Sequence, residues 1–365
     1  MIIDYKLDEI FLKAKKVYNS LADEKSKKIF SLRILYNLTG DYDYLFDMIE
    51  LLSEFDTNEV YKLRKFYHMI KKIKEENKSS KLIIYGAGRQ GNYLFDIFRN
   101  IDWHCFCDKD MQKQKNNFCG LKVISPEELI DKNKNDFVII GIKNNSKEVY
   151  NELISKGFPD KHIINYEINF DLKILFEKQY FDDTFILPEE NEIFIDAGSF
   201  NCDTSLLFKK WCNENYKKIY AFEPDYLNYL NCKDVIKERK IDRIELYNYG
   251  LWSENDTLYF NKEGNSSSSI SEEGCEKIHV VSLDNILSEE KISFIKMDIE
   301  GAELQGLKGA KNIIVKNRPK LAICIYHKPE DILEIPLYLQ SIVPDYKFYI
   351  RHYSNHDIET VLYAV

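Results

Sequence analysis

The sequence lacks three features that would each indicate a particular class of protein. No apolar run reaches the roughly 18 residues that a membrane-spanning helix needs, so no membrane span is expected. The eight cysteines are scattered and form no CxxC pair, which argues against a zinc site and favours reduced core thiols. Basic residues are not in excess, because the formal net charge is -9, and no nucleic-acid partner is therefore expected.

The beginning of the chain also lacks the pattern of a secretory signal. The stretch MIIDYKLDEIFLK carries acidic residues early and has no long apolar core. Together with the unpaired cysteines, this pattern predicts a cytoplasmic protein.

The pattern along the 365 residues predicts an α/β protein of three segments. Residues 1–78 carry apolar residues at helical spacing and are expected to form an N-terminal helical segment. Residues 79–168 alternate apolar strands with helices and predict a small Rossmann-type βαβ domain. Residues 169–365 alternate strands and helices again, which predicts a second, larger parallel sheet covered on both faces.

The end of the third segment departs from this alternation. YKFYIRHY and ETVLYAV are two strands joined by SNHDI, which leaves no room for a helix, so we expect an antiparallel hairpin. A Rossmann-like parallel sheet closed by such a hairpin is the architecture of class I methyltransferases, and a nicotinamide Rossmann domain normally lacks it. Earlier in the segment, the Gly- and Ser-rich residues 261–274 predict a loop, either a plain surface loop or a lid.

The second segment contains a glycine pattern typical of dinucleotide-binding loops. In KLIIYGAGRQG, a strand is followed by Gly86, Gly88 and Gly91 and then by a helix. Asp108 ends the next strand, 20 residues after Gly88 (108 − 88), where an acid that binds a ribose is expected. The pattern alone is a weak signal, because the segment is short and offers no catalytic partner. It predicts either a site for a nucleotide or nucleotide-sugar, or a purely architectural domain.

The third segment has acids at the ends of two successive strands. Asp196 ends the strand EIFID and is followed by Gly198, and Glu223 ends the strand KIYAFE. An acid in this place would repel phosphates, whereas it suits a cationic ligand that has none. Asp196 can then face a sulfonium and an ammonium group, and Glu223 can accept hydrogen bonds from ribose hydroxyls. The alternative interpretation is that both carboxylates only cap helix N-termini.

Several motifs of the third segment occur together in one family. SFIKMDIEGAELQGLKGA is preceded by IDAGSFNCDTS, AFEP, YNYGLW and VVSLDNIL and followed by PKLAICIYHKPEDILEIPLYL. In this order the motifs closely resemble the FkbM-type methyltransferases that depend on S-adenosylmethionine, over roughly residues 190–365. Residues 80–168 look like the small Rossmann-type domain that often precedes this catalytic domain and is related in appearance to nucleotide-sugar-binding domains.

The resemblance implies methyl transfer to oxygen, often on a sugar hydroxyl in natural-product or surface-glycan pathways. It implies a pocket for S-adenosylmethionine lined by Asp196, Gly198, Asn201, Thr204, Glu223 and Asn248. It also implies an acceptor side lined by Asp298, Glu300 and His327. The chain departs from the family at Cys202, where a glycine is usual. A side chain there could crowd the methionine moiety or strain a backbone with positive φ.

The chemistry of such a transfer fits residues at strand ends. A hydroxyl is a poor nucleophile until a base removes its proton, and the ordinary pKa of imidazole suits His327 for that role near neutrality. Asp298 ends the strand FIKMD and His327 ends LAICIYH, and parallel strands end at one edge of a sheet. Asp298 and Glu300 could orient the histidine or bind a divalent metal that acidifies the hydroxyl, and the sequence does not decide between these roles.

The sequence therefore predicts a cytoplasmic S-adenosylmethionine-dependent O-methyltransferase that acts on a sugar of a glycan or nucleotide-linked precursor. Two other functions stay open. A degenerate methyltransferase fold could act as a binding or scaffold protein, for which Cys202 is the motive. A nicotinamide-dependent oxidoreductase could instead use the loop from Gly86 to Gly91. The acceptor, the methylated position and the oligomeric state are not predicted.

Overall fold

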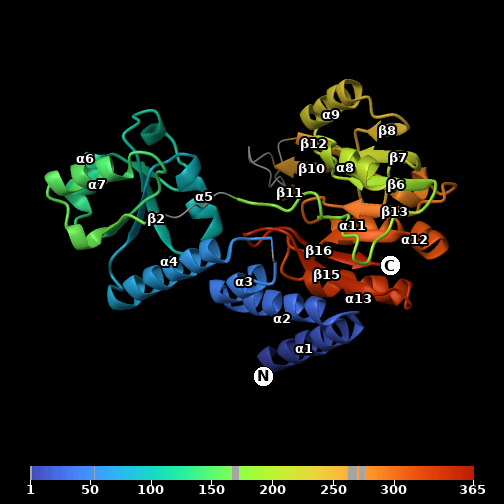
Figure 1. The fold of residues 1–365 in the computed structure, drawn as a ribbon, viewed down its shortest axis with the longest axis horizontal. Helices are drawn as coiled ribbons and strands as arrows, with labels where there is room; N and C mark the ends of the chain where they lie inside the picture. Colours follow the sequence, from blue (N-terminus) through green and yellow to red (C-terminus); the bar gives the residue numbers. More distant parts are fainter. Residues whose placement is uncertain (1, 53, 167–171, 262–268, 271–275) are drawn as a thin grey trace. The chain divides into compact units, whose positions relative to one another are not determined.

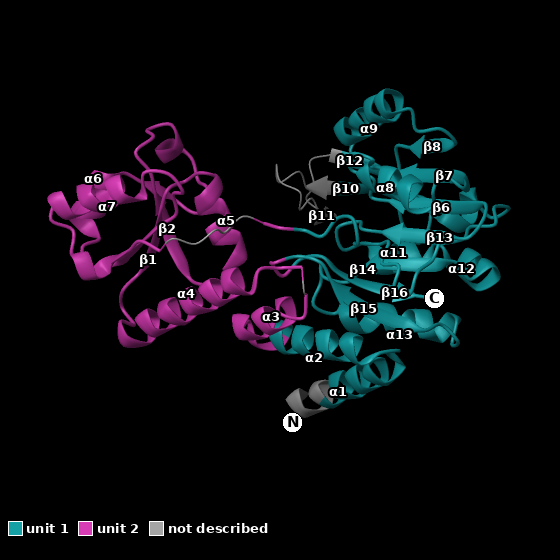
Figure 2. Cartoon of the chain, viewed as in Figure 1, with its two compact units in different colours: residues 1–37, 174–354, 358–365 teal, residues 38–173, 355–357 magenta. Residues whose placement is uncertain are grey.

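The chain is divided into two compact units (Figure 1, Figure 2). The computed structural model describes residues 2–52, 54–166, 172–261, 269–270 and 276–365. Unit 1 consists of residues 1–37, 174–354 and 358–365, and unit 2 consists of residues 38–173 and 355–357. Each unit contains a β-sheet with a run of parallel strands, as the alternating pattern predicts.

Unit 2 is built around a five-stranded parallel sheet with the order β3-β2-β1-β4-β5. The strands are β1 (Leu82–Tyr85), β2 (Trp103–Cys107), β3 (Val123–Ile124), β4 (Phe137–Ile140) and β5 (Ile163–Ile164). The helices are α3 (Tyr42–Ile49), α4 (Thr57–Glu76), α5 (Arg89–Ile97), α6 (Pro126–Lys132) and α7 (Ser146–Ser155), with short 3-10 turns at Lys113–Lys115 and Asp160–His162. Every residue of β1 and β4 is buried, which explains why these strands are continuous apolar runs.

Unit 1 contains a seven-stranded sheet with the order β15-β16-β14-β13-β6-β7-β8. The strands are β6 (Glu192–Ala197), β7 (Tyr216–Phe222), β8 (Ile244–Tyr247), β13 (Phe294–Met297), β14 (Lys320–Cys324), β15 (Phe348–His352) and β16 (Thr360–Ala364). The first five strands in space, from β8 to β14, are parallel, and β16 is antiparallel to both β14 and β15. The predicted closing hairpin is therefore confirmed, and its last strand lies between β14 and β15.

Helices follow the strands of unit 1 in alternation. They are α8 (Asp203–Trp211), α9 (Tyr226–Arg239), α10 (Leu283–Ile286), α11 (Glu303–Lys308), α12 (Lys311–Asn317) and α13 (Asp331–Ile342). On one face of the sheet, Phe194 of β6 and Phe208 of α8 are stacked with ring centroids 4.2 Å apart, and Phe294 of β13 joins the same cluster. This aromatic core fixes α8 against the sheet, and the loop that leads into α8 carries several of the predicted site residues.

A second sheet of unit 1 was not predicted. It has the order β11-β10-β12-β9, with β9 (Gly250–Leu251), β10 (Asp256–Asn261), β11 (Ser269–Ile270) and β12 (Glu276–Val281). Most of the loop predicted over residues 261–274 lies outside the described residues, but its described part at Asn261 and Ser269–Ile270 is strand.

The N-terminal helices are divided between the two compact units. Helix α1 (Ile2–Ser20) and most of α2 (Glu24–Thr39) belong to unit 1, whereas α3 and α4 belong to unit 2. The turn between α1 and α2 covers the edge strand β15: the Ala22 N–H donates to the Phe348 carbonyl over 2.8 Å, and Arg351 pairs with Asp23. The division of the chain into domains at 1–78, 79–168 and 169–365 stays a prediction. Among the described helices, none has the length and apolar character required to cross a membrane.

Candidate functional site

The residues predicted from the third segment lie in unit 1 at the carboxyl ends of the parallel strands. Those expected to bind the cofactor lie at the end of β6 and in the loop and helix after it, or follow β7 and β8, and are Asp196, Gly198, Asn201, Thr204, Glu223 and Asn248. Those expected on the acceptor side follow β13 and β14 and are Asp298, Glu300 and His327. Ligands of open α/β sheets bind at this edge.

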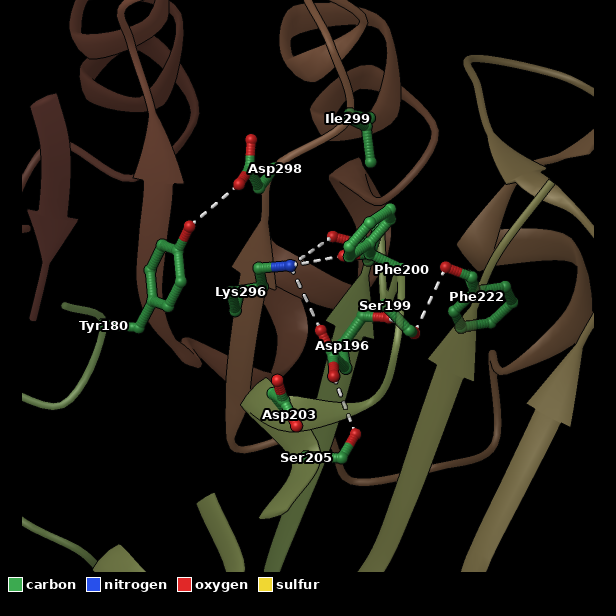
Figure 3. A network of polar contacts seen from close by, with 12 residues as sticks. Tyr180, Asp196, Ser199, Phe200, Asp203, Ser205, Phe222, Lys296, Asp298 and Ile299 are labelled. Atoms are coloured by element: carbon green, nitrogen blue, oxygen red, sulfur yellow. Dashed lines mark hydrogen bonds and ion pairs between the residues drawn. The ribbon is translucent and has the colours of Figure 1, made fainter. Parts of the chain in front are cut away.

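The carboxylate of Asp196 is fully buried and is held by two partners. Ser205 donates its hydroxyl to Oδ2 over 2.7 Å, and Lys296 Nζ lies 3.2 Å from Oδ1 (Figure 3). The sequence predicts that Asp196 faces the cofactor, and such a contact stays a prediction. Through these two contacts, Asp196 joins the start of α8 to the middle of β13.

Lys296 is the residue of this region that sequence reasoning missed. Its ammonium group donates to the carbonyls of Ala197 (3.0 Å) and Gly198 (2.7 Å) as well as to Asp196 (Figure 3). Burial opposes its charge, but Asp196 and Asp298 raise its pKa above the ordinary value. A buried ammonium therefore fastens the loop after β6, and the available signal was a lysine inside the apolar strand FIKM.

Gly198 ties this loop to the end of β13. Its φ is +74°, and a Cβ at this position would lie 1.8 Å from the carbonyl oxygen of Asp298. Its N–H donates to the Phe222 carbonyl over 3.0 Å, which joins the loop to β7 as well. Only glycine fits, because any side chain would collide with backbone.

Glu223 follows β7, and each oxygen of its nearly buried carboxylate accepts one backbone N–H. Phe200 donates over 2.8 Å and Asp225 over 3.0 Å. Burial raises the pKa of Glu223, and these N–H groups oppose that change. Asn248 donates its amide to the carbonyl of Glu223 over 2.8 Å, so the ends of β7 and β8 are joined.

Cys202 lies at the N-cap of α8 with a φ of 62° and is completely buried. A side chain at this position is expected to strain the backbone if φ is positive, and φ is positive here. A hydrogen bond with Cys232 and burial both raise the pKa of the Cys202 thiol far above its ordinary value. The side chain thus packs inside the protein as an uncharged thiol.

The three predicted residues of the acceptor side come together around the imidazole of His327. Its Nε2 lies 3.4 Å from Asp298 Oδ1 and 3.5 Å from Glu300 Oε2. Its Nδ1 lies 3.1 Å from Oε1 of Glu303, a buried residue at the start of α11. Tyr180 donates its hydroxyl to Asp298 Oδ2 over 2.9 Å (Figure 3). One imidazole is therefore surrounded by carboxylates from the loop after β13 and from α11.

These carboxylates change the electrostatics that the sequence suggested. Burial lowers the pKa of His327, but Glu303, Asp298 and Glu300 together raise it to about 9. The expectation of an imidazole with an ordinary pKa is therefore wrong, and the free site carries an imidazolium near neutrality. Burial raises the pKa of Glu300 to about 7, and His327 opposes that change. Carboxylate and imidazole groups at these distances can exchange protons or hold a cation.

The candidate nucleotide residues lie together in unit 2. Gly88 directly precedes α5, and a Cβ on Gly91 would lie 1.9 Å from the Gly86 carbonyl oxygen, so close packing requires glycine there. Asp108 follows β2, and its Oδ2 accepts the Ala87 N–H over 2.8 Å and the Lys113 ammonium over 3.0 Å. The carboxylate expected to bind a ribose thus already holds the glycine loop, and nucleotide binding stays a prediction.

Comparison with known families assigns two parts of the chain. Residues 196–348 match the family described as "Methyltransferase FkbM domain". Residues 78–164 match the family described as "C2185-like, N-terminal". No curated protein matches the chain.

One solved structure shares the fold of this chain. A methyltransferase FkbM from Methylobacillus flagellatus KT is 18% identical, with a TM-score of 0.55 over 81% of this chain and 93% of that one. An rRNA methylase from Streptococcus thermophilus is 17% identical, with a TM-score of 0.33 over 52% of this chain and 90% of that one. The first similarity shows a shared fold, whereas the TM-score of the second is too low to support an inference.

Proposed function

We propose that this methyltransferase uses S-adenosylmethionine to methylate a hydroxyl of a sugar, on a glycan precursor or a nucleotide-linked sugar in the cytoplasm, because residues 196–348 match the FkbM methyltransferase domain. The observation that carries the proposal is the contact between the two halves of the site. The loop after β6 and the loop after β13 touch at Gly198 and Asp298, so a cofactor at the first loop would lie beside an acceptor at the second.

The proposed cofactor site consists of Asp196, Gly198, Asn201, Thr204, Glu223 and Asn248. Glu223 supports it most directly. The carboxylate offers four lone pairs and accepts the N–H groups of Phe200 and Asp225 and a side-chain hydrogen bond from Asn228, so one lone pair is left for a ribose hydroxyl. Asp196 is proposed to act through the loop that it anchors, because its carboxylate is already paired with the Lys296 ammonium.

The proposed acceptor side consists of Asp298, Glu300 and His327. Their carboxylates can accept hydrogen bonds from neighbouring hydroxyls, as a sugar would offer. In the reaction, the acceptor oxygen forms a bond to the methyl carbon while the bond from that carbon to sulfur breaks. The hydroxyl proton passes to the cluster, and S-adenosylhomocysteine leaves. Most of the acceleration is expected from holding the oxygen, carbon and sulfur in line.

Glu223→Ala tests the cofactor site. Its removal should weaken S-adenosylmethionine binding by about 1–3 kcal/mol, the scale of a lost charge-assisted hydrogen bond, measured by calorimetry. Glu238→Ala removes an exposed carboxylate from α9 and should leave the affinity unchanged. Equal affinities of both variants and wild type would contradict the assignment of the pocket.

A ligand panel separates the proposed function from its rivals. Thermal shifts with S-adenosylmethionine, S-adenosylhomocysteine, NAD and UDP-sugars report which ligands bind the folded state. The proposal expects stabilisation by the first two. Stabilisation by NAD alone would favour the oxidoreductase, and none by any of them would favour a binding or scaffold protein.

A nucleotide site in unit 2 is a second proposal for the same enzyme, and its ligand would be a nucleotide or a nucleotide-sugar. It is supported by Gly88, where a Cβ would meet only Lys113 Nζ, at 3.8 Å, so the approach to the start of α5 is open. A bulky side chain at Gly88 should then abolish stabilisation by UDP-sugars and leave S-adenosylmethionine binding intact.

A further inference from the structure

The cluster after β13 and β14 has the donor set of a metal site. Asp298, Glu303 and His327 each offer one ligand atom, and all three atoms lie within 4.8 Å of one another. Two carboxylates and one imidazole are ligands that divalent transition ions such as Mn²⁺ and Fe²⁺ accept, usually with further positions open to solvent or substrate.

Buried atoms in this cluster lack the partners that such atoms usually have. Within the described residues, neither ring nitrogen of His327 nor Oε2 of Glu303 has a hydrogen-bond partner, although all three atoms are buried. The neighbouring carboxylates lie within ion-pair distance of the His327 ring, but they do not have hydrogen-bond geometry with it. The Glu303 side chain is 0% exposed and that of His327 is 10% exposed. An unsatisfied buried group costs about 1–3 kcal/mol, so these atoms point to a ligand between them.

The neighbouring lysines do not fill this role. Lys296 donates to Asp196 and to the carbonyls of Ala197 and Gly198. Lys328 donates to the carbonyl of Gly301. Among the described residues, neither neighbouring lysine therefore neutralises the carboxylates at the centre of the cluster.

We propose that Asp298, Glu303 and His327 bind a divalent cation of the Mn²⁺ type. Glu303 Oε1 is fixed by the Ile299 N–H over 2.8 Å, which leaves Oε2 to face the cation. Glu300, exposed and 3.5 Å from His327 Nε2, completes the set from the solvent side. The role of the cation rests on the proposed methyl transfer, in which it would lower the pKa of the acceptor hydroxyl. The binding of the cation does not depend on that proposed function.

Manganese binding by the full-length chain, first treated with a chelator, tests the site. The electron paramagnetic resonance signal of free Mn²⁺ is lost on binding, which gives the stoichiometry and affinity. Wild type should bind one Mn²⁺ per chain. His327→Ala and, separately, Asp298→Asn should weaken binding at least about tenfold, because even the loss of an outer-shell partner costs 10–100-fold. Circular dichroism shows whether each variant folds, and either folded variant suffices.

Two controls locate the cation. His279→Ala removes an exposed histidine from β12 and should bind Mn²⁺ like wild type. Glu359→Gln distinguishes the proposed site from the other donor group of the described residues, Asp298, Cys324 and Glu359, and should also leave binding unchanged.

Three results would overturn the proposal. The first is that wild type binds no Mn²⁺ up to about 1 mM, the weak end of protein cation sites. The second is that both folded ligand variants bind Mn²⁺ as tightly as wild type, and the third is that only Glu359→Gln loses Mn²⁺ affinity. Calorimetry with S-adenosylmethionine on the same samples keeps the two proposals apart. Cofactor binding without Mn²⁺ binding refutes the metal site alone, and the reverse refutes the proposed function alone.

Discussion

Gly198→Ala probes the contact on which the candidate site depends. A Cβ at Gly198 would lie 1.8 Å from the carbonyl oxygen of Asp298 and 2.9 Å from its carbonyl carbon, so the loop after β6 must move away from the end of β13. The positive φ of +74° adds strain of about 1–2 kcal/mol for a non-glycine residue. The collision adds about 1–3 kcal/mol of overpacking, because backbone cannot rotate aside as a side chain can.

Gly120→Ala is the matched control for this variant. Gly120 has a φ of +75°, and a Cβ there meets nothing within 4 Å. It therefore carries the same backbone strain without the collision, and the difference between the two variants isolates the contact with Asp298. Chemical denaturation should show Gly198→Ala less stable than Gly120→Ala by about 1–3 kcal/mol.

The effect on the cofactor is read by calorimetry on the folded variants. The loop after β6 carries proposed cofactor residues and must move to make room for the new Cβ. S-adenosylmethionine should therefore bind at least about tenfold more weakly to Gly198→Ala, which corresponds to about 1.4 kcal/mol. Gly120→Ala should bind like wild type. Equal stabilities and affinities of both variants would refute the argument that the two loops are in forced contact.

Three further comparisons of variants test local features. Cys202→Gly should be less destabilising than Cys202→Ala, the reverse of the usual order, because glycine relieves the strain at a φ of 62° whereas alanine keeps it; the free energy of unfolding decides. Gly91→Ala should destabilise by more than about 2 kcal/mol, since its Cβ would lie 1.9 Å from a backbone oxygen, while Gly88→Ala should fold like wild type. Burial opposes ionisation of Asp23, but Arg351 lowers its pKa to about 2, below the unfolded value near 3.9. The stabilisation by Asp23 is thus present above about pH 4 and lost as the pH falls toward 2. The denaturation midpoint of wild type should therefore fall more steeply over this range than that of Asp23→Asn. An equal or shallower fall would contradict the pairing.

The local pattern of the sequence was sufficient to predict the class of the fold and the edge of the sheet at which the candidate site residues lie. The alternation of apolar strands and helices predicts two parallel sheets, and the short link SNHDI predicts the closing hairpin, because a link of five residues has no room for a helix. Acids and glycine after successive strands predict one edge, because parallel strands end on the same side. These inferences need only neighbours in sequence.

The pairing of charges could not be predicted in this way, since it depends on which strands are neighbours. Lys296 and Asp196 are direct partners in the parallel register of β13 and β6, although 100 residues separate them (296 − 196). The chain order of the strands does not reveal that β13 follows β6 in space. Only this register turns a lysine in an apolar strand into the ammonium that fastens the loop at Gly198.

The tertiary structure also decided the charge state at the acceptor side. The sequence placed His327 and Asp298 at one edge, but the pKa of an imidazole depends on every charge within a few ångströms. Glu303, 3.1 Å from Nδ1, reaches the ring because the turn through Glu300 and Gly301 has two consecutive positive φ angles. The sequence determined which residues meet at the strand ends; the distances between them, fixed by loops and register, determined that carboxylates surround the imidazole and raise its pKa.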